Sequence, residues 1–196
     1  MYISKLGFLG GIIMKKVLRY LLMTVMALFV SLPCLSAEAA SVALLPLINN
    51  VEGGDDVANQ VFYKEAIATM KLQKGFVLME NDKINAAIEA ARIGDDVPDK
   101  ATLAKIAKDG NVDIVIAMQI DDLEDKPVFP SSERMLELDM EGKAVAYNRL
   151  TGSYYEHEFK SDKQIDETLT SRWDWVHEEF GRQVRIEIKR ALKAKK

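Results

Sequence analysis

The sequence predicts an α/β fold in three layers, in which helices flank a mixed sheet of about five strands. Short continuous apolar runs, typical of strands buried on both faces, alternate with helical periodicity over residues 41–118. From residue 136, apolar and polar residues alternate, which is typical of strands with one face in the core and one exposed to solvent. An apolar stripe of helical spacing closes the chain. We therefore expect a parallel βαβααβ part, an antiparallel hairpin and a long C-terminal amphipathic helix.

The first forty residues have the order of a secretory leader. Lys15 and Lys16 precede an apolar run over residues 20–32, and Ala37 and Ala39 match the A-x-A cleavage pattern. We expect a signal peptide over residues 1–39, with the mature protein starting at Ala40 or Ser41. The basic segment begins at Met14, which makes Met14 an alternative to Met1 as the true start.

An uncleaved membrane anchor is the alternative interpretation of the leader. A spanning helix needs about 20 apolar residues, and Pro33 interrupts this run. Cys34, the sole cysteine, invites a lipoprotein interpretation, but Pro33 stands where lipoprotein signals have a small residue. We expect Cys34 to be removed with the leader, which leaves no disulfide or thiol chemistry.

Residues 40–196 have the length of one domain with a single core. The leader carries four Lys or Arg and one Glu, so 22 basic and 29 acidic residues remain, with a net charge of −7. Nucleic-acid binding needs a basic footprint, so this balance argues against nucleic acid as the partner.

The parallel part starts with a strand over residues 41–48, in which Pro46 is expected to end the ladder pairing. A polar loop follows, and Asp55 or Asp56 can cap a helix that Gly75 ends. The parallel part continues with a strand over residues 76–79 and a helix capped by Asn81 or Asp82. It ends with a helix over residues 99–108 and a strand over residues 114–118.

The antiparallel part follows an acidic segment, residues 121–134, which two prolines favour as a loop. Leu136, Leu138 and Met140 then alternate with acids, and Val145 and Tyr147 resume the alternation one residue out of phase. A bulge at Gly142 explains this shift, and a short hairpin there is the alternative. A turn over residues 150–152 leads to a strand over residues 154–159.

The last helix is expected from about residue 169 to the end of the chain. Its apolar stripe is a candidate core or interface surface and consists of Trp173, Val176, Phe180, Val184 and Ile188. Its basic residues are a candidate contact surface for anionic lipid or an acidic partner and comprise Arg182, Arg185, Lys189, Arg190 and Lys193. Complementing the helix dipole is the simpler explanation of these charges, and we favour it.

The sequence offers little that indicates catalysis or cofactor binding. The two histidines, His157 and His177, stand beside glutamates, but neighbours on one strand or helix do not converge on one ion. The Gly53-Gly54 pair lacks the rest of a phosphate-binding fingerprint. The chain after the leader has no cysteine and no nucleophile elbow. We therefore expect no catalytic, metal or cofactor site.

Several segments together resemble an envelope superfamily that includes CsgG-like curli secretion proteins, penicillin-binding-protein activator lipoproteins and the amino-terminal domain of TolB. The resemblance rests on Val42–Pro46 with Asn49-Asn50, Gly75–Glu80, Val112–Ile116, Tyr147–Gly152 and the terminal helix. It covers nearly all of residues 40–196. Pore-forming members carry a lipidated cysteine and membrane hairpins, and neither is expected here, since residues 121–134 are too acidic to face lipid.

The resemblance implies a noncatalytic binding or assembly module, in the periplasm or at the outer membrane, soluble or peripherally attached. Its partners would be envelope proteins, with self-association compatible with this role. The alternatives are an envelope hydrolase with an unfamiliar site and, if the leader is retained, a membrane-anchored accessory protein. A cleft that contains His157 or His177 with carboxylates would favour the hydrolase, and an apolar groove or sheet edge would favour the module.

Overall fold

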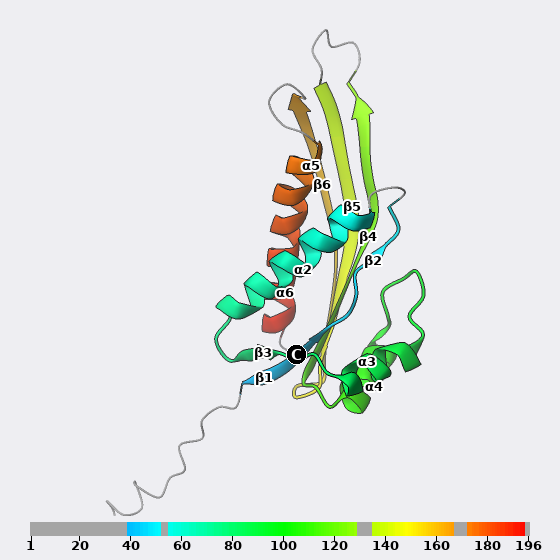
Figure 1. Cartoon of the computed structure of the whole chain (residues 1–196), viewed down its shortest axis with the longest axis vertical. Helices are drawn as coiled ribbons and strands as arrows, with labels where there is room; N and C mark the ends of the chain where they lie inside the picture. The colour runs from blue at the N-terminus through cyan, green and yellow to red at the C-terminus, as the bar shows by residue number, and fades with distance from the viewer. Residues whose placement is uncertain (1–38, 52–54, 129–134, 167–171, 195–196) are drawn as a thin grey trace, which may run out of the picture. The chain divides into compact units, whose positions relative to one another are not determined.

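The computed structural model describes residues 39–51, 55–128, 135–166 and 172–194, which belong to one compact unit, Ala39–Lys196. Its centre is a six-stranded sheet in the order β3-β1-β4-β5-β6, with β2 beside β4 (Figure 1). The strands are β1 (Ala40–Leu44), β2 (Ile48–Asn49), β3 (Phe76–Leu78), β4 (Ile114–Pro127), β5 (Met135–Asn148) and β6 (Ser153–Asp166).

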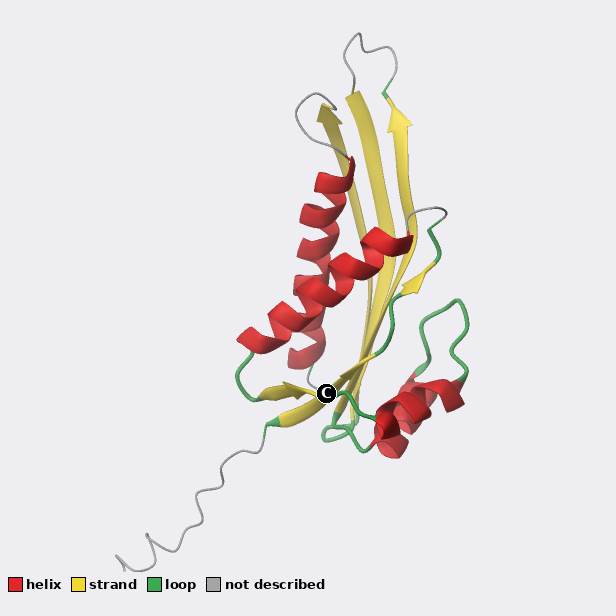
Figure 2. Cartoon of the chain, in the orientation of Figure 1, coloured by secondary structure: helices red, strands yellow, loops and turns green. Residues whose placement is uncertain are grey.

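Helices cover both faces of the sheet, as Figure 2 shows. They are α2 (Asp55–Leu72), α3 (Asp82–Ala91), α4 (Lys100–Gly110), α5 (Arg172–Trp175), the π-helical turn η1 (Val176–Phe180) and α6 (Gly181–Lys193). Residues of α2, η1 and α6 share one buried cluster with one sheet face, and residues of α3 and α4 share a second cluster with the other. The predicted three-layer α/β fold with a mixed sheet and a C-terminal helix is confirmed.

Strands β1, β3 and β4 pair in parallel, as expected from the helical crossovers between them. The predicted strand over residues 41–48 is divided in two. Pairing with β4 stops after Leu44 and resumes at Ile48, because Pro46 lacks the N–H that a continuous ladder requires. Asn81 caps α3 and Asp99 caps α4, each through a side-chain oxygen that accepts a backbone N–H.

Two expectations about the antiparallel part are wrong. Residues 121–127 are not a loop, because β4 runs to Pro127 and pairs with β5 along its whole length. Residues 129–134 of the expected loop lie outside the described residues. Strand β6 also continues to Asp166, well beyond Phe159. Pairing with a neighbour stabilises these polar segments, which have little strand propensity of their own.

The bulge is on β4 and not at Gly142. The register shifts between Ile120 and Asp122, so Asp121 is the extra residue, and Gly142 pairs regularly with Phe159 on the other side. Leu138, Met140, Ala144 and Ala146 therefore all face the α2 and α6 cluster. Val145 and Tyr147 are out of phase with these residues because they face the opposite cluster, with α3 and α4, which is also apolar.

The C-terminal helix contributes to the core. Val176, Phe180, Val184 and Ile188 have no exposed surface. Trp173 does not join them: it is 41% exposed, whereas Trp175 is 2% exposed. The π-helical turn explains the difference, because i to i+5 geometry aligns Trp175, and not Trp173, with Phe180.

Candidate functional site

A groove opens beside the carboxyl ends of β1 and β3. Strand β3 ends at Leu78, opposite Val42, whereas the β1–β2 segment continues to Asn49. The groove lies between that continuation and α3. In open α/β sheets, the carboxyl ends of parallel strands are the usual location of binding sites.

The groove, called the α3 groove from here on, consists of two adjoining hollows. The first has a volume of about 360 Å³ and is lined by Leu44, Pro46, Tyr63, Glu80, Asn85, Ile88 and Glu89. The second, of about 380 Å³, is lined by Pro46–Asn50, Ile88, Glu89, Arg92, Ile93, Gly94 and Asp95. Both share Pro46, Ile88 and Glu89. Apolar side chains dominate the shared wall, and charged and amide groups line the rim, which is the composition of a binding cleft.

The far wall of the groove depends on the bulge in β4. Asn50 Nδ2 donates to the backbone carbonyl of Asp95 and to the carboxylate of Asp121, both at 3.0 Å. Gln119, which is 6% exposed, donates to the same carboxylate and accepts a hydrogen bond of 2.7 Å from the Val97 N–H. Asn50 and Gln119 thus join the segment after α3 to the extra residue of β4. Bulges are frequent beside functional sites.

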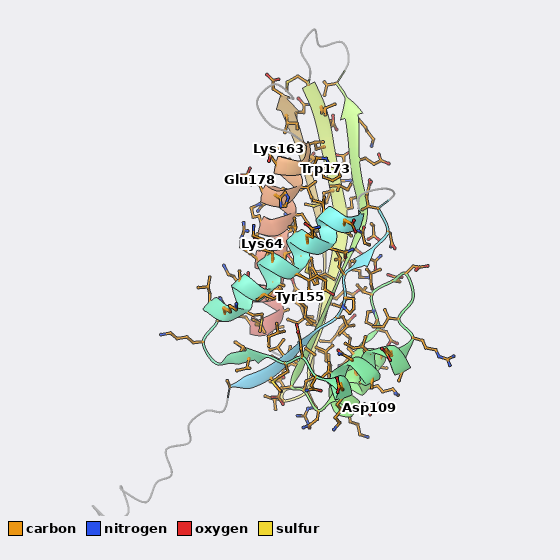
Figure 3. All side chains as sticks on the ribbon, in the orientation of Figure 1. Lys64, Asp109, Tyr155, Lys163, Trp173 and Glu178 are labelled. Carbon is orange, nitrogen blue, oxygen red and sulfur yellow. The ribbon has the colours of Figure 1, made fainter. Side chains whose placement is uncertain are left out.

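His157 lies outside this groove, on the face of β6 that carries α6. Its Nδ1 is 3.3 Å from the carboxylate of Glu187, which has no exposed surface. Glu187 also accepts hydrogen bonds from the Tyr155 phenol at 2.5 Å and from Arg190 at 2.9 Å. Tyr155 is labelled in Figure 3. The structure therefore brings together a histidine, a carboxylate and a tyrosine between β6 and the last helix, outside the lining of the α3 groove.

The other predicted residues are dispersed. His177 is exposed on η1. Three of the five basic residues on the last helix have carboxylate partners: Arg182 pairs with Glu179, Arg185 with Glu65 and Arg190 with Glu187. Lys189 and Lys193 are exposed. Within the chain, much of the expected basic contact surface is therefore neutralised.

The processing signals lie mostly outside the described residues. Met14, Cys34 and Ala37 belong to residues 1–38, whereas Ala39 precedes β1 and Ala40 is its first residue. The Ala40 N–H donates to the Gly75 carbonyl at 2.8 Å. A chain that begins at Ala40 would therefore begin directly in the sheet.

The described part of the chain has no helix that is both long and apolar enough to cross a membrane. Over the same residues, no three His, Cys, Asp or Glu side chains are grouped in a way that could hold a metal ion.

Sequence reasoning missed the groove and the buried carboxylate, although both had signals. Asn50 follows an apolar strand of a parallel sheet, where polar residues tend to line binding sites. Glu187 stands three residues after Val184 and four before Ala191, on the apolar stripe itself. A carboxylate at that spacing indicates a buried group that requires partners.

No protein-family model matches the chain, and the search of curated proteins found no match. Among solved structures, a hypothetical protein from Chlamydia trachomatis is 10% identical, with a TM-score of 0.47, over 78% of this chain and 93% of that protein. A lipoprotein from Neisseria meningitidis is 10% identical, with a TM-score of 0.45, over 74% and 97%. The LpoB C-terminal domain from Salmonella enterica is 8% identical, with a TM-score of 0.38, over 66% and 84%. Similarities this low support no functional conclusion.

Proposed function

We propose that this protein is a noncatalytic, exported module of the bacterial cell envelope that binds an extended segment of a partner protein in the α3 groove. The observation that carries the proposal is the groove itself. It combines apolar and polar lining residues, and it lies beside the sheet edge where, over the described residues, no strand continues the pairing of β1 beyond Leu78. Extended segments commonly dock beside sheet edges, with side chains entering adjacent hollows.

The lining of the groove supports binding over catalysis. The side chains that line the two hollows include no Ser, Thr, Cys or His, so they offer neither an aliphatic hydroxyl or thiol nucleophile nor an imidazole base. His157 and Glu187 are an acid–base pair by residue type, but Glu187 has no exposed surface for a substrate to reach.

Export to the envelope rests on the leader and on the resemblance to CsgG-like and TolB-like proteins. The test is amino-terminal sequencing of the protein recovered from native envelopes. We expect the sequence to begin at Ala40 or Ser41. Recovery of Met1, or of a lipid on Cys34, would refute this part of the proposal.

The groove is tested by selecting phage-displayed random dodecapeptides on the exported protein. Each selected peptide is then measured against Ile88→Glu, which places a charge on the wall shared by both hollows. We expect this variant to lose binding, because its carboxylate would have to be desolvated under an apolar segment.

The matched control is Ile186→Glu, at a partly buried position on α6 outside the groove lining. It should retain peptide binding, and the melting temperatures of both variants show whether they fold. Peptides that bind the wild type and the Ile88→Glu variant equally would rule out the groove as the binding site. If a second copy of this chain is the partner, binding and dimerisation should both be lost in Ile88→Glu.

A further inference from the structure

We propose that the first hollow of the α3 groove, between Tyr63, Glu80 and Glu89, binds a Lys or Arg side chain of the partner segment. This inference rests on the proposed function and names the chemistry of the partner. It follows from the charge, shape and composition of the hollow.

The two carboxylates at this hollow have no ion-pair partner in the part of the chain that the structure describes. Glu80 and Glu89 are both exposed and line the same hollow. Acidic side chains elsewhere on the surface frequently form ion pairs with a Lys or Arg of the same chain. Examples are Glu65 with Arg185, Asp109 with Lys105, Glu141 with Lys160, Glu156 with Lys143 and Glu179 with Arg182. A cationic group from outside would complete the pairing at the hollow.

Tyr63 adds an aromatic surface to the same hollow. The residue is 39% exposed. Burial, followed by the negative charge of Glu80, raises the pKa of Tyr63 above its ordinary value, which indicates that the carboxylate and the phenol share one environment. An ammonium or guanidinium group beside an aromatic ring gains cation–π attraction in addition to the ion pair.

The walls match the stem of a long basic side chain. Leu44, Pro46 and Ile88 are apolar and line the same hollow as the two carboxylates. Lys and Arg bury their methylene stems against such surfaces and keep the charged head at the polar edge. The Asn85 amide adds a neutral hydrogen-bonding group at the rim.

The second hollow differs from the first in its charge, and this difference sets the direction in which a partner segment would bind. Arg92 lines it together with Glu89 and Asp95, so a cation is already present there. We therefore assign the basic side chain to the first hollow and an apolar side chain, which would contact Leu47, Ile48 and Ile93, to the second.

The test uses the dodecapeptides selected on the exported wild-type protein. We expect a Lys or Arg in those that depend on Ile88. Replacing the Lys or Arg of the peptide by norleucine keeps the aliphatic stem and removes the charge. This change should weaken binding about tenfold, as expected for loss of a charged hydrogen bond. Binding should also weaken as the salt concentration rises.

Variants of the protein test the same contact from the other side. The preference for the charged peptide over its norleucine analogue should fall in Glu80→Gln and in Glu89→Gln. In the double variant Glu80→Lys with Glu89→Lys, the preferred peptide should be an analogue that contains Glu in place of the basic residue. The matched control is Glu158→Gln, which removes an exposed carboxylate from β6 and should leave the preference unchanged.

The outcomes separate the two proposals. Peptides that require Ile88 but contain no basic residue, or that bind equally well with norleucine, would overturn the inference and leave the groove intact. If no selected peptide requires Ile88, the proposed function fails, and the inference fails with it. A charge preference that persists in the double Lys variant also overturns the inference, because it must then originate elsewhere.

Discussion

The phenol of Tyr155 donates a hydrogen bond of 2.5 Å to the carboxylate of Glu187, a side chain with no exposed surface. The contact joins edge strand β6 to α6 through two residues that are 32 positions apart in the chain. Burial, together with the hydrogen bond to Glu187 and its charge, raises the pKa of Tyr155 well above its ordinary value. A buried carboxylate is tolerated only when partners replace its lost water, so Tyr155 and Arg190 hold this helix in place.

Tyr155→Phe should therefore destabilise the fold. The variant keeps the ring but removes one hydrogen bond from a buried charge, a loss of about 1.5–3 kcal/mol in the free energy of unfolding. Urea denaturation at neutral pH measures it. Tyr154→Phe is the matched control, because Tyr154 faces the other side of the sheet, and we expect little change. Equal stability of the two variants would show that Glu187 does not depend on Tyr155.

Phe180→Ala tests whether the last helix is core. Phe180 has no exposed surface, so the variant should lose about 3–5 kcal/mol of stability. Trp173→Ala removes a larger but 41% exposed side chain and should cost much less. Thermal denaturation with oligomeric-state measurement compares them. A Phe180→Ala protein that melts like the wild type but loses a partner would mean that the stripe is an interface.

Gly142→Ala should distort the pairing opposite the β4 bulge. A Cβ at this position would lie 2.5 Å from the ring of Phe159 and would overlap the Gln119 carbonyl oxygen. We expect a loss of about 1–3 kcal/mol from overpacking, measured by urea denaturation. Gly94→Ala is the control, since nothing lies within 4 Å of its new methyl group. If Gly142→Ala is as stable as the wild type, the strands can separate there without cost.

Asp113 should make stability depend on acid pH. Its carboxylate accepts hydrogen bonds from the Ser41 N–H at 2.9 Å, the Ser41 hydroxyl at 2.8 Å and Arg149 at 2.8 Å. Burial alone raises the pKa of Asp113, but these hydrogen bonds outweigh it, and the net pKa lies below the ordinary 3.8. The resulting stabilisation is complete above pH 3.8 and is lost as pH falls through the lower folded-state pKa.

The comparison is wild type against Asp113→Asn, unfolded by urea at pH 7, pH 5 and about pH 3. The variant should be less stable at pH 7 and pH 5, and the difference should shrink at the lowest pH, where the wild-type carboxylate begins to take up a proton. A difference that stays constant over this range would mean that the charge of Asp113 contributes nothing.

Much of the fold could be predicted from the sequence, because many of its elements depend on interactions between residues that are close in the chain. Asn81, one of the two predicted candidates, caps α3, because an N-cap needs only a short side-chain oxygen near the next turn. Asp99, expected as the first residue of the following helix, is its N-cap. The apolar run at Ile114 pairs in parallel with β1 and is buried on both faces, because a segment without polar alternation is stable only when covered on both sides. None of these predictions depended on distant residues.

The α3 groove could not be predicted from local sequence patterns. The α3 groove needs Ile88 of one helix, Tyr63 of another and Pro46 after a strand to meet at one edge, and sequence spacing does not encode that meeting. The bulge at Asp121 was misassigned to Gly142 because two apolar faces of β5 look like one face that changes phase.

The sequence alone thus indicated most of the elements and their order, all of which depend on neighbours along the chain. On the same kind of local pattern it predicts a leader, and it contains no familiar catalytic motif. Tertiary structure decided that an acidic segment would be a strand, that Trp175 and not Trp173 would be buried, and that Glu187 would have partners inside the core. These outcomes depend on pairing and burial between distant segments, whose energies exceed the local propensities that a sequence displays.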